Sequence, residues 1–275
     1  MKARIAVFCV VSAFFFTIPA AGAGHLGWWW LGGLITAAAL APVVRFGPRS
    51  FVGQFGAVAL VLVVVGLVCT LSEAWVFTPS MKPQIPYLAT GGTAMYLITA
   101  ALVVGLARVL KLNDDGREMA VSRHSAGMTA VYVLLAGASY VVYYYIFGAL
   151  TFRFFTHQYY PHAIQEVAAM GAGFYVYQWA RGILMVLAVL PVIYTLRMGR
   201  WKAAVTVGIL VWVVGGLAPL LAPNTLMVAA QRYIHIVEIM TQNVPLGMTA
   251  VWILRGGGKA VSGKLLAKSG WRKSG

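Results

Sequence analysis

Residues Val52–Leu71 read VGQFGAVALVLVVVGLVCTL and contain no charged side chain. An α-helix of about 20 mainly apolar residues spans the roughly 30 Å hydrocarbon core of a bilayer. This apolar run is continuous, whereas the strands of a membrane β-barrel alternate apolar and polar residues over about ten positions. The stretch therefore predicts a transmembrane α-helix.

The rest of the chain has the same character. Of its 275 residues, 61% are hydrophobic and 10% are charged, whereas a soluble domain carries about 25% charged residues. Polar side chains are too few to cover a surface that faces water, so lipid must surround much of the protein. We predict an all-α polytopic bundle, with a single domain over residues 1–254. Its eight spans are approximately Ile5–Ala23, Leu26–Val44, Val52–Leu71, Tyr87–Leu110, Ala126–Leu150, Val167–Leu196, Ala203–Leu221 and Thr225–Leu254.

Basic residues gather in alternate connections, and an excess of Lys and Arg marks the cytoplasmic loops of membrane proteins. Seventeen of the 21 Lys and Arg residues fall on one side of the eight-span arrangement: Lys2, Arg4, Arg45, Arg49, Arg108, Lys111, Arg117, Arg123, Arg197, Arg200, Lys202, Arg255, Lys259, Lys264, Lys268, Arg272 and Lys273. The other four are Lys82, Arg153, Arg181 and Arg232. This distribution predicts a multi-pass protein of a bacterial-type inner membrane with both termini in the cytoplasm. It also explains the net charge of +15 without nucleic acid as a partner.

The first segment has a second interpretation. Lys2 and Arg4, the apolar stretch Ile5–Ile18 and the sequence Ala21-Gly22-Ala23 also resemble a secretory signal peptide with its cleavage site. Cleavage would leave seven spans and would not change the orientation of the others.

The tail over residues 255–275 is rich in Gly, Lys and Ser. This composition predicts a disordered cytoplasmic segment that lies on anionic lipid headgroups. The outside connections are short, long, long and short in chain order, which does not match a parallel duplication of four spans. We therefore identify no internal repeat, and no motif points to a known family.

The eighth predicted span carries a stripe of polar residues. At about 100° per residue, Arg232, His235, Glu238, Gln242 and Asn243 share one face of the helix. An ionisable group in the middle of a membrane costs about 2.5–3.5 kcal/mol on insertion scales, so this face must point into the bundle or a wet cavity. Two interpretations stay open: polar contacts that hold helices together, or the lining of a ligand, ion or proton path.

Arg181 lies inside the sixth predicted span, close to several aromatic residues. Its guanidinium could reach the outer interface among these rings, or it could pair with Glu238 or Glu73. Because Glu73 lies near Trp75, at the outer end of the third span, we expect Glu73 to be an interfacial residue.

No cofactor is predicted. His157 and His162 are five residues apart, which is not a strong zinc spacing; with His235 they are weak candidates for a metal site. A haem held by two histidines needs both at similar depth on facing helices, and only His235 is clearly inside a span. Cys9 and Cys69 lie in separate apolar runs and are interpreted as packing residues.

The leading functional hypothesis is a small permease-like protein, with a pocket in the outer half built from Arg232, His235, Glu238, Gln242 and Asn243 and with Arg181 opposite. In it an arginine would hold an anionic group, and His235 with Glu238 would relay a proton or polarise a ligand. One alternative is a non-catalytic scaffold or assembly subunit of an envelope complex, with a protein partner or a second copy. Another is a membrane enzyme for lipid or quinone around His157, His162 and Glu166. The balance is against an enzyme.

Overall fold

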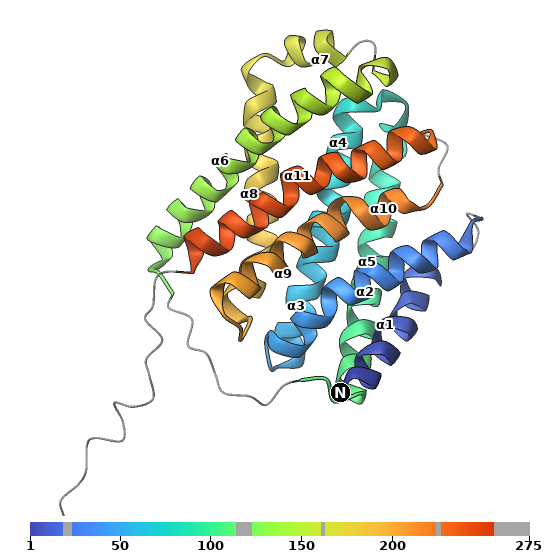
Figure 1. Ribbon diagram of the computed structural model, residues 1–275, viewed down its shortest axis with the longest axis vertical. Coiled ribbons are helices and arrows are strands. Elements are labelled where there is room, and N and C mark those ends of the chain that lie inside the picture. Colours follow the sequence, from blue (N-terminus) through green and yellow to red (C-terminus); the bar gives the residue numbers. More distant parts are fainter. Residues whose placement is uncertain (19–23, 114–122, 161–162, 224–226, 256–275) are drawn as a thin grey trace, which may run out of the picture.

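The computed structural model describes residues 1–18, 24–113, 123–160, 163–223 and 227–255, which form a bundle of long helices (Figure 1). All regular secondary structure in these ranges is helical. The predicted all-α class is confirmed.

Seven α-helices are uninterrupted: α1 (Lys2–Thr17), α2 (Leu26–Phe46), α5 (Ile85–Val109), α6 (Ala126–Thr151), α7 (Ala163–Met170), α8 (Ala172–Thr195) and α11 (Ala229–Leu254). Two more long helices contain a π-helical segment. The first consists of α3 (Phe51–Leu60), η2 (Val61–Val68) and α4 (Cys69–Phe77), and the second of α9 (Arg200–Trp212), η6 (Val213–Leu217) and α10 (Ala218–Leu221). A third π-helical segment, η4 (Phe152–Thr156), directly continues α6, and short 3-10 turns occupy Pro79–Met81 and His157–Tyr159.

Among the described residues, six helices are long and apolar enough to cross a membrane, so the chain is a multi-pass membrane protein. They are Leu26–Phe46, Phe51–Phe77, Ile85–Val109, Ala126–Tyr159, Ala172–Thr195 and Arg200–Leu221. The other two predicted spans correspond to α1 and α11, which lie in the same bundle (Figure 1). Helix α1 has 16 residues, and the polar stripe of α11 lowers its hydropathy.

The first segment is an integral part of the bundle. Helix α1 packs along α2 and α5, and the ring of Phe8 is completely buried. The candidate cleavage sequence at residues 19–23 lies outside the described residues.

The prediction was wrong about where the sixth span begins. Instead of one helix from Val167, the structure has the separate helix α7, and α8 begins at Ala172. Gly171 between them has a φ of +52°, a left-handed conformation that glycine adopts without a Cβ clash and that ends a helix. Helices α6 and α10 end, and α8 and α11 begin, at the end of the bundle that holds α7 (Figure 1). We call this the α7 end; the prediction places it outside the cell.

At the opposite end, arginines donate hydrogen bonds to the last carbonyl groups of neighbouring helices. Arg197 Nη2 donates to the carbonyl oxygen of Arg45 in α2 at 3.1 Å, and Arg200 donates to the carbonyl oxygen of Trp252 in α11. These carbonyls have no partner within their own helix and carry its partial negative charge. Some of the basic residues behind the predicted orientation therefore also stabilise helix ends.

Arg255 departs from the prediction, which made it the first residue of a disordered tail. Its side chain is buried and donates to three carbonyl oxygens at or beyond the end of α8. These acceptors are Ile193 at 2.6 Å, Leu196 at 2.6 Å and Met198 at 2.9 Å. A buried guanidinium with such acceptors is ordered because leaving them would expose unsatisfied carbonyls. Residues 256–275, the rest of the predicted tail, lie outside the described residues.

The π-helical segments η2 and η6 pack against each other. A methyl group added to Gly66 of η2 would lie 3.1 Å from Val214 Cγ1, and one added to Gly215 of η6 would lie 3.0 Å from Val65 Cγ1. The two backbones therefore approach closely. π-Helical turns in long helices are frequently found at functional sites, and the cavity described next lies beside this crossing.

Candidate functional site

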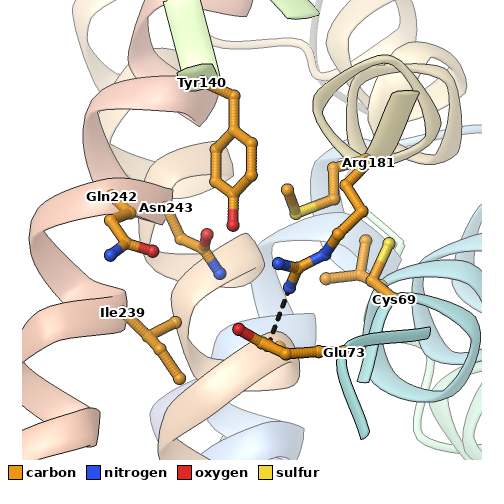
Figure 2. A pocket seen from close by; sticks show the side chains of 10 residues that line it. Cys69, Glu73, Tyr140, Arg181, Ile239, Gln242 and Asn243 are labelled. Atoms are coloured by element: carbon orange, nitrogen blue, oxygen red, sulfur yellow. Dashed lines mark hydrogen bonds and ion pairs between the residues drawn. The ribbon is translucent and has the colours of Figure 1, made fainter. Parts of the chain in front are cut away.

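A small cavity lies between helices at the centre of the bundle. Its lining comes from η2, α4, α6, α8, η6 and α11, and consists of Val65, Cys69, Glu73, Tyr140, Arg181, Met185, Gly215, Ile239, Gln242 and Asn243 (Figure 2). Its volume is about 10 Å³ for the centre of a water-sized sphere. A single water needs roughly 10–15 Å³ on this measure. The cavity therefore has room for about one water and not for an organic substrate.

The main charges at the cavity are an ion pair between α8 and α4. Arg181 Nη2 donates to Glu73 Oε2 at 2.9 Å, and Arg181 Nη1 donates to Gln178 Oε1 at 3.1 Å. The guanidinium carbon lies 5.7 Å from the ring centroid of Tyr140 and 5.9 Å from that of Tyr177. The Arg181 side chain is 8% exposed and that of Glu73 is 36% exposed. The carboxylate thus neutralises a nearly buried cation.

Arg181 combines features of both interpretations, since it contacts aromatic rings and pairs with an acid. The described contacts give it Glu73 as its acidic partner, not Glu238. Glu73, which the sequence predicts to be interfacial, is one of the residues that line the cavity (Figure 2). The reason is its position one helical turn after Cys69, on the side of α4 that faces α8.

A chain of hydrogen bonds runs along α11 toward the cavity. The Tyr160 hydroxyl lies 2.9 Å from His235 Nε2, and His235 Nδ1 lies 2.8 Å from Glu238 Oε2. Gln242 Nε2 donates to Glu238 Oε1 at 3.3 Å. We call Tyr160, His235, Glu238 and Gln242 the polar chain. Gln242 belongs to both the polar chain and the cavity lining.

The polar chain has two hydrogen-bonding states that differ in the position of protons. With neutral His235, Nδ1–H donates to the Glu238 carboxylate and Nε2 accepts from the Tyr160 hydroxyl. With a second proton on the imidazole, Nε2–H donates to the Tyr160 oxygen instead. His235 therefore joins an acid to a hydroxyl in either state, which is the arrangement that a proton relay needs.

Tyr160 lies outside the long apolar helices, at the α7 end. Burial raises the pKa of its phenol to about 12. The hydroxyl is therefore neutral over the physiological range and can both donate and accept. It can pass a proton without carrying a charge.

Asn243 leaves one polar atom on the cavity without a partner in the described chain. Its Nδ2 donates to the Val211 carbonyl oxygen at 3.3 Å, whereas its buried Oδ1 has no hydrogen-bond partner. The hydroxyl of Tyr140 points toward this amide and toward Arg181 (Figure 2). Since buried polar atoms are normally satisfied, these groups suit a bound water.

Arg232 does not join the other residues of the predicted stripe. Its Nη1 donates to the carbonyl oxygens of Leu220 at 3.3 Å and Leu221 at 3.1 Å, at the end of α10. Of the six predicted site residues, Arg181, Gln242 and Asn243 line the cavity, and His235 and Glu238 connect to it through Gln242. Arg232 stabilises a helix end.

The weak metal candidates are not gathered by the structure. His157 is exposed, His162 lies outside the described residues, and His235 is bonded to Tyr160 and Glu238. Within the part of the chain that the structure describes, no three His, Cys, Asp or Glu side chains are grouped so as to hold a metal ion. The cysteines are free, and Cys69 is buried.

Three site residues were missed from the sequence: Tyr140, Tyr160 and, as a lining residue, Glu73. Tyr140 and Tyr160 belong to tyrosine-rich stretches that also suit an aromatic belt at the membrane boundary. Tyr140 lies near the middle of α6, a turn before the cluster Tyr143–Tyr145. This position could have distinguished Tyr140 from an aromatic belt, because the aromatic residues of a belt lie near helix ends.

Comparison with known proteins gives no relative. No protein-family model matches the chain, and neither a curated protein nor a solved structure is significantly similar to it.

Proposed function

We propose that the chain is a small membrane transport protein that moves protons between the α7 end and the centre of the bundle. One observation supports this most: the unbroken series of hydrogen bonds from Tyr160 through His235 and Glu238 to Gln242, which ends at the cavity. Ionisable groups inside a membrane bundle are costly and typically mark ion or proton paths.

The contacts favour protons over an anionic substrate. The charge of Arg181 is already balanced by Glu73, and Arg232 donates to the carbonyls at the end of α10. The sequence had suggested that one of these arginines holds an anion. Their contacts favour other roles for both. A cavity of about 10 Å³ also suits water or a proton rather than an organic molecule.

The test measures proton uptake by liposomes that contain the purified protein and a trapped pH-sensitive dye. A potassium diffusion potential drives protons inward. We expect faster acidification than in protein-free liposomes. Glu238→Gln keeps the size of the side chain but removes the acid, and should slow the uptake at least ~10-fold, at the modest end of general acid–base effects.

Thr241→Val is the matched control for Glu238→Gln. Thr241 lies on the same helix and makes only a local bond to the Glu238 carbonyl oxygen at 2.7 Å. This variant should conduct like the wild type. Uptake by the wild type no faster than in protein-free liposomes would refute the proposal.

The small size of the cavity favours a second candidate, a non-catalytic scaffold or assembly subunit. A closed interior needs no transport role, and the long helices would present surfaces to partner proteins. Under this proposal the native complex would contain a partner in fixed stoichiometry, and Glu238→Gln would lower folded yield without any effect on proton movement. For an enzyme around His157 and Glu166, the described side chains of these exposed residues make no hydrogen bond to those of the polar chain; only the His157 carbonyl oxygen accepts from the backbone N–H of Tyr160, at 3.3 Å.

We further propose a bacterial-type inner membrane as the location, with both termini in the cytoplasm and the basic tail on anionic lipid. The distribution of Lys and Arg supports this orientation. Accessibility of single cysteines introduced at Ser50 and at the exposed Gly173 to a membrane-impermeant thiol reagent in intact cells tests it. Only the cysteine at position 173 should react.

A further inference from the structure

Two stretches of the sequence match at a constant shift of 149 residues (30 to 179). Residues 30–44 read WLGGLITAAALAPVV, and residues 179–193 read WARGILMVLAVLPVI. Tryptophan, glycine, alanine, proline and valine recur at equal spacings. Both prolines, Pro42 and Pro191, lie inside long helices, which is an uncommon position for proline.

The same shift relates the structures of these helices. Helix α2 ends at Phe46 and α8 at Thr195, while α3 begins at Phe51 and α9 at Arg200. Every buried residue of α2 has a buried counterpart in α8. The π-helical segments η2 and η6 end at equivalent positions, Val68 and Leu217, and Val65-Gly66 corresponds to Val214-Gly215. An amphipathic pattern alone would not align helix ends and a π-helical segment together.

Close contacts repeat as well. A methyl group added to Gly33 would lie 2.7 Å from the carbonyl oxygen of its neighbour in α1, and one added to Gly182 would lie 2.5 Å from that of its neighbour in α6. The residues met by Gly33 are Ala13 and Phe16, and those met by Gly182 are Gly137 and Tyr140. Ala13 and Phe16 correspond to Gly137 and Tyr140 at a single shift of 124 residues (13 to 137).

The contacts between the two sets of helices are reciprocal. Gly66 meets Val214, and its counterpart Gly215 meets Val65, the counterpart of Val214. Helix α2 packs against α9, η6 and α10, while α8 packs against α3, η2 and α4. Each of these contacts between the two sets of helices therefore occurs twice, with the two partners exchanged. This is the pattern that a twofold axis produces.

A duplication was not predicted because the shift is not constant along the chain. The connection between the first two spans is much longer in the second half, where it holds the turns at residues 152–159 and α7. This insertion accounts for the long connection before α8 and its short counterpart between α1 and α2. The buried residues of α5, which are Thr99, Ala100, Val103, Val104 and Ala107, match buried residues of α11 at a third shift of 143 residues (99 to 242).

We infer that the chain is a tandem duplication of a four-span unit, and that the polar cavity is a functional site present at only one of two equivalent contacts between the units. The units are α1–α5 and α6–α11. This inference rests on the proposed function for its activity, and the duplication rests on the sequence and packing alone. Under the duplication, α1 corresponds to α6 and α11 corresponds to α5. Both of these counterparts are long and apolar enough to cross a membrane.

The second contact supplies an internal control for the first. Each polar lining residue has a smaller or less polar counterpart: Gly32 for Arg181, Ala222 for Glu73, Phe16 for Tyr140, Thr99 for Gln242 and Ala100 for Asn243. There Gly32 packs directly on α10, since an added methyl group would lie 3.1 Å from the carbonyl oxygen of Ala218. The same helix pairing therefore forms without any of the charges. The ion pair at the cavity is not required for packing and is assigned to function.

The test removes the charges and leaves the packing. The double variant Arg181→Met/Glu73→Ala has an apolar chain of similar length at 181 and the counterpart residue at 73. We expect wild-type folded yield, a melting temperature in detergent within about 3 °C of wild type, equivalent to less than about 1 kcal/mol, and proton uptake slowed at least ~10-fold. A large loss of folded yield would overturn the inference, because the ion pair would then be structural.

Tyr140→Phe is the second variant and is close to isosteric. It installs the residue that stands at position 16 and removes only the hydroxyl on the cavity. Unchanged melting with slower proton uptake supports the inference, whereas a fall in melting temperature of ~5 °C or more contradicts it. If the wild type moves no protons, the proposed function fails, while the melting arm still decides whether the ion pair is structural.

Discussion

The two contacts between the four-span units have the same helices and opposite chemistry. Where α8 meets α4, a nearly buried guanidinium and a carboxylate face each other at 2.9 Å. Where α2 meets α10, Gly32 lies on the backbone of Ala218, and Gly32 and Ala222 stand at the positions of the ion pair. Equivalent backbones thus pack with or without the polar groups. The comparison separates what the bundle needs in order to fold from what has been placed in it.

Some polar residues of the second unit are needed for folding, and Arg255 is one of them. Arg255 follows α11, and the residue at the corresponding position after α5 is the fully buried Leu112. The guanidinium of Arg255 satisfies three carbonyl oxygens near the end of α8. Its role is therefore structural, and it should respond to substitution differently from Arg181.

Among the substitutions that test the equivalence of the units, the largest effect is expected at the two matched glycines. Gly33→Ala and Gly182→Ala each place a methyl group within 2.7 Å of a helix backbone, and each should cost about 2–3 kcal/mol of unfolding free energy through overpacking. SDS titration of the purified variants measures it. Gly105→Ala is the control, since a methyl group there meets nothing within 4 Å, and it should be neutral or slightly stabilising. Tolerance at only one of the two glycines would break the equivalence of the units.

Arg255→Leu installs the counterpart residue and should still destabilise the protein. Three carbonyl oxygens near the end of α8 lose the guanidinium as a donor, at a cost of about 2 kcal/mol. The same titration measures this, and proton uptake per folded protein should not change. A neutral result would mean that counterpart substitutions are tolerated everywhere, and the comparison would no longer distinguish Arg181.

The smallest effect is expected at Asn243→Ala, which installs the residue that stands at position 100. One hydrogen bond to Val211 is lost, so unfolding should change by about 1 kcal/mol or less. Proton uptake per folded protein should fall, because the free Oδ1 on the cavity is removed. Equal loss of folded protein and of uptake would return Asn243 to a packing role.

The sequence was sufficient for the fold class because the apolar runs are long and continuous. Periodicity also identified the face of α11 that carries His235, Glu238, Gln242 and Asn243. It failed for Arg232, since the angular position of a residue on a helix does not say which carbonyls of a neighbouring helix lie within reach. The partner of Arg181 was likewise open, because pairing with Glu73 or Glu238 depends on how α8 is placed against α4 and α11.

The duplication was hidden for a different reason. Few identities remain between the units, and the longer connection before α8 changes the shift between one pair of spans and the next. Only the burial pattern, the helix ends and the glycine contacts restore the correspondence. Long-range arrangement of this kind is a property of packing, which apolar periodicity does not specify.

The interaction energy between Arg181 and Glu73 tests the central claim most directly. SDS unfolding is compared for the wild type, Arg181→Met, Glu73→Ala and the double variant. Glu73→Ala alone should cost about 2–4 kcal/mol, because it leaves a nearly buried guanidinium without its counter-charge. The double variant should return to within about 1 kcal/mol of wild type. A double variant at least as unstable as Glu73→Ala alone would contradict the claim and show that the ion pair holds the bundle together.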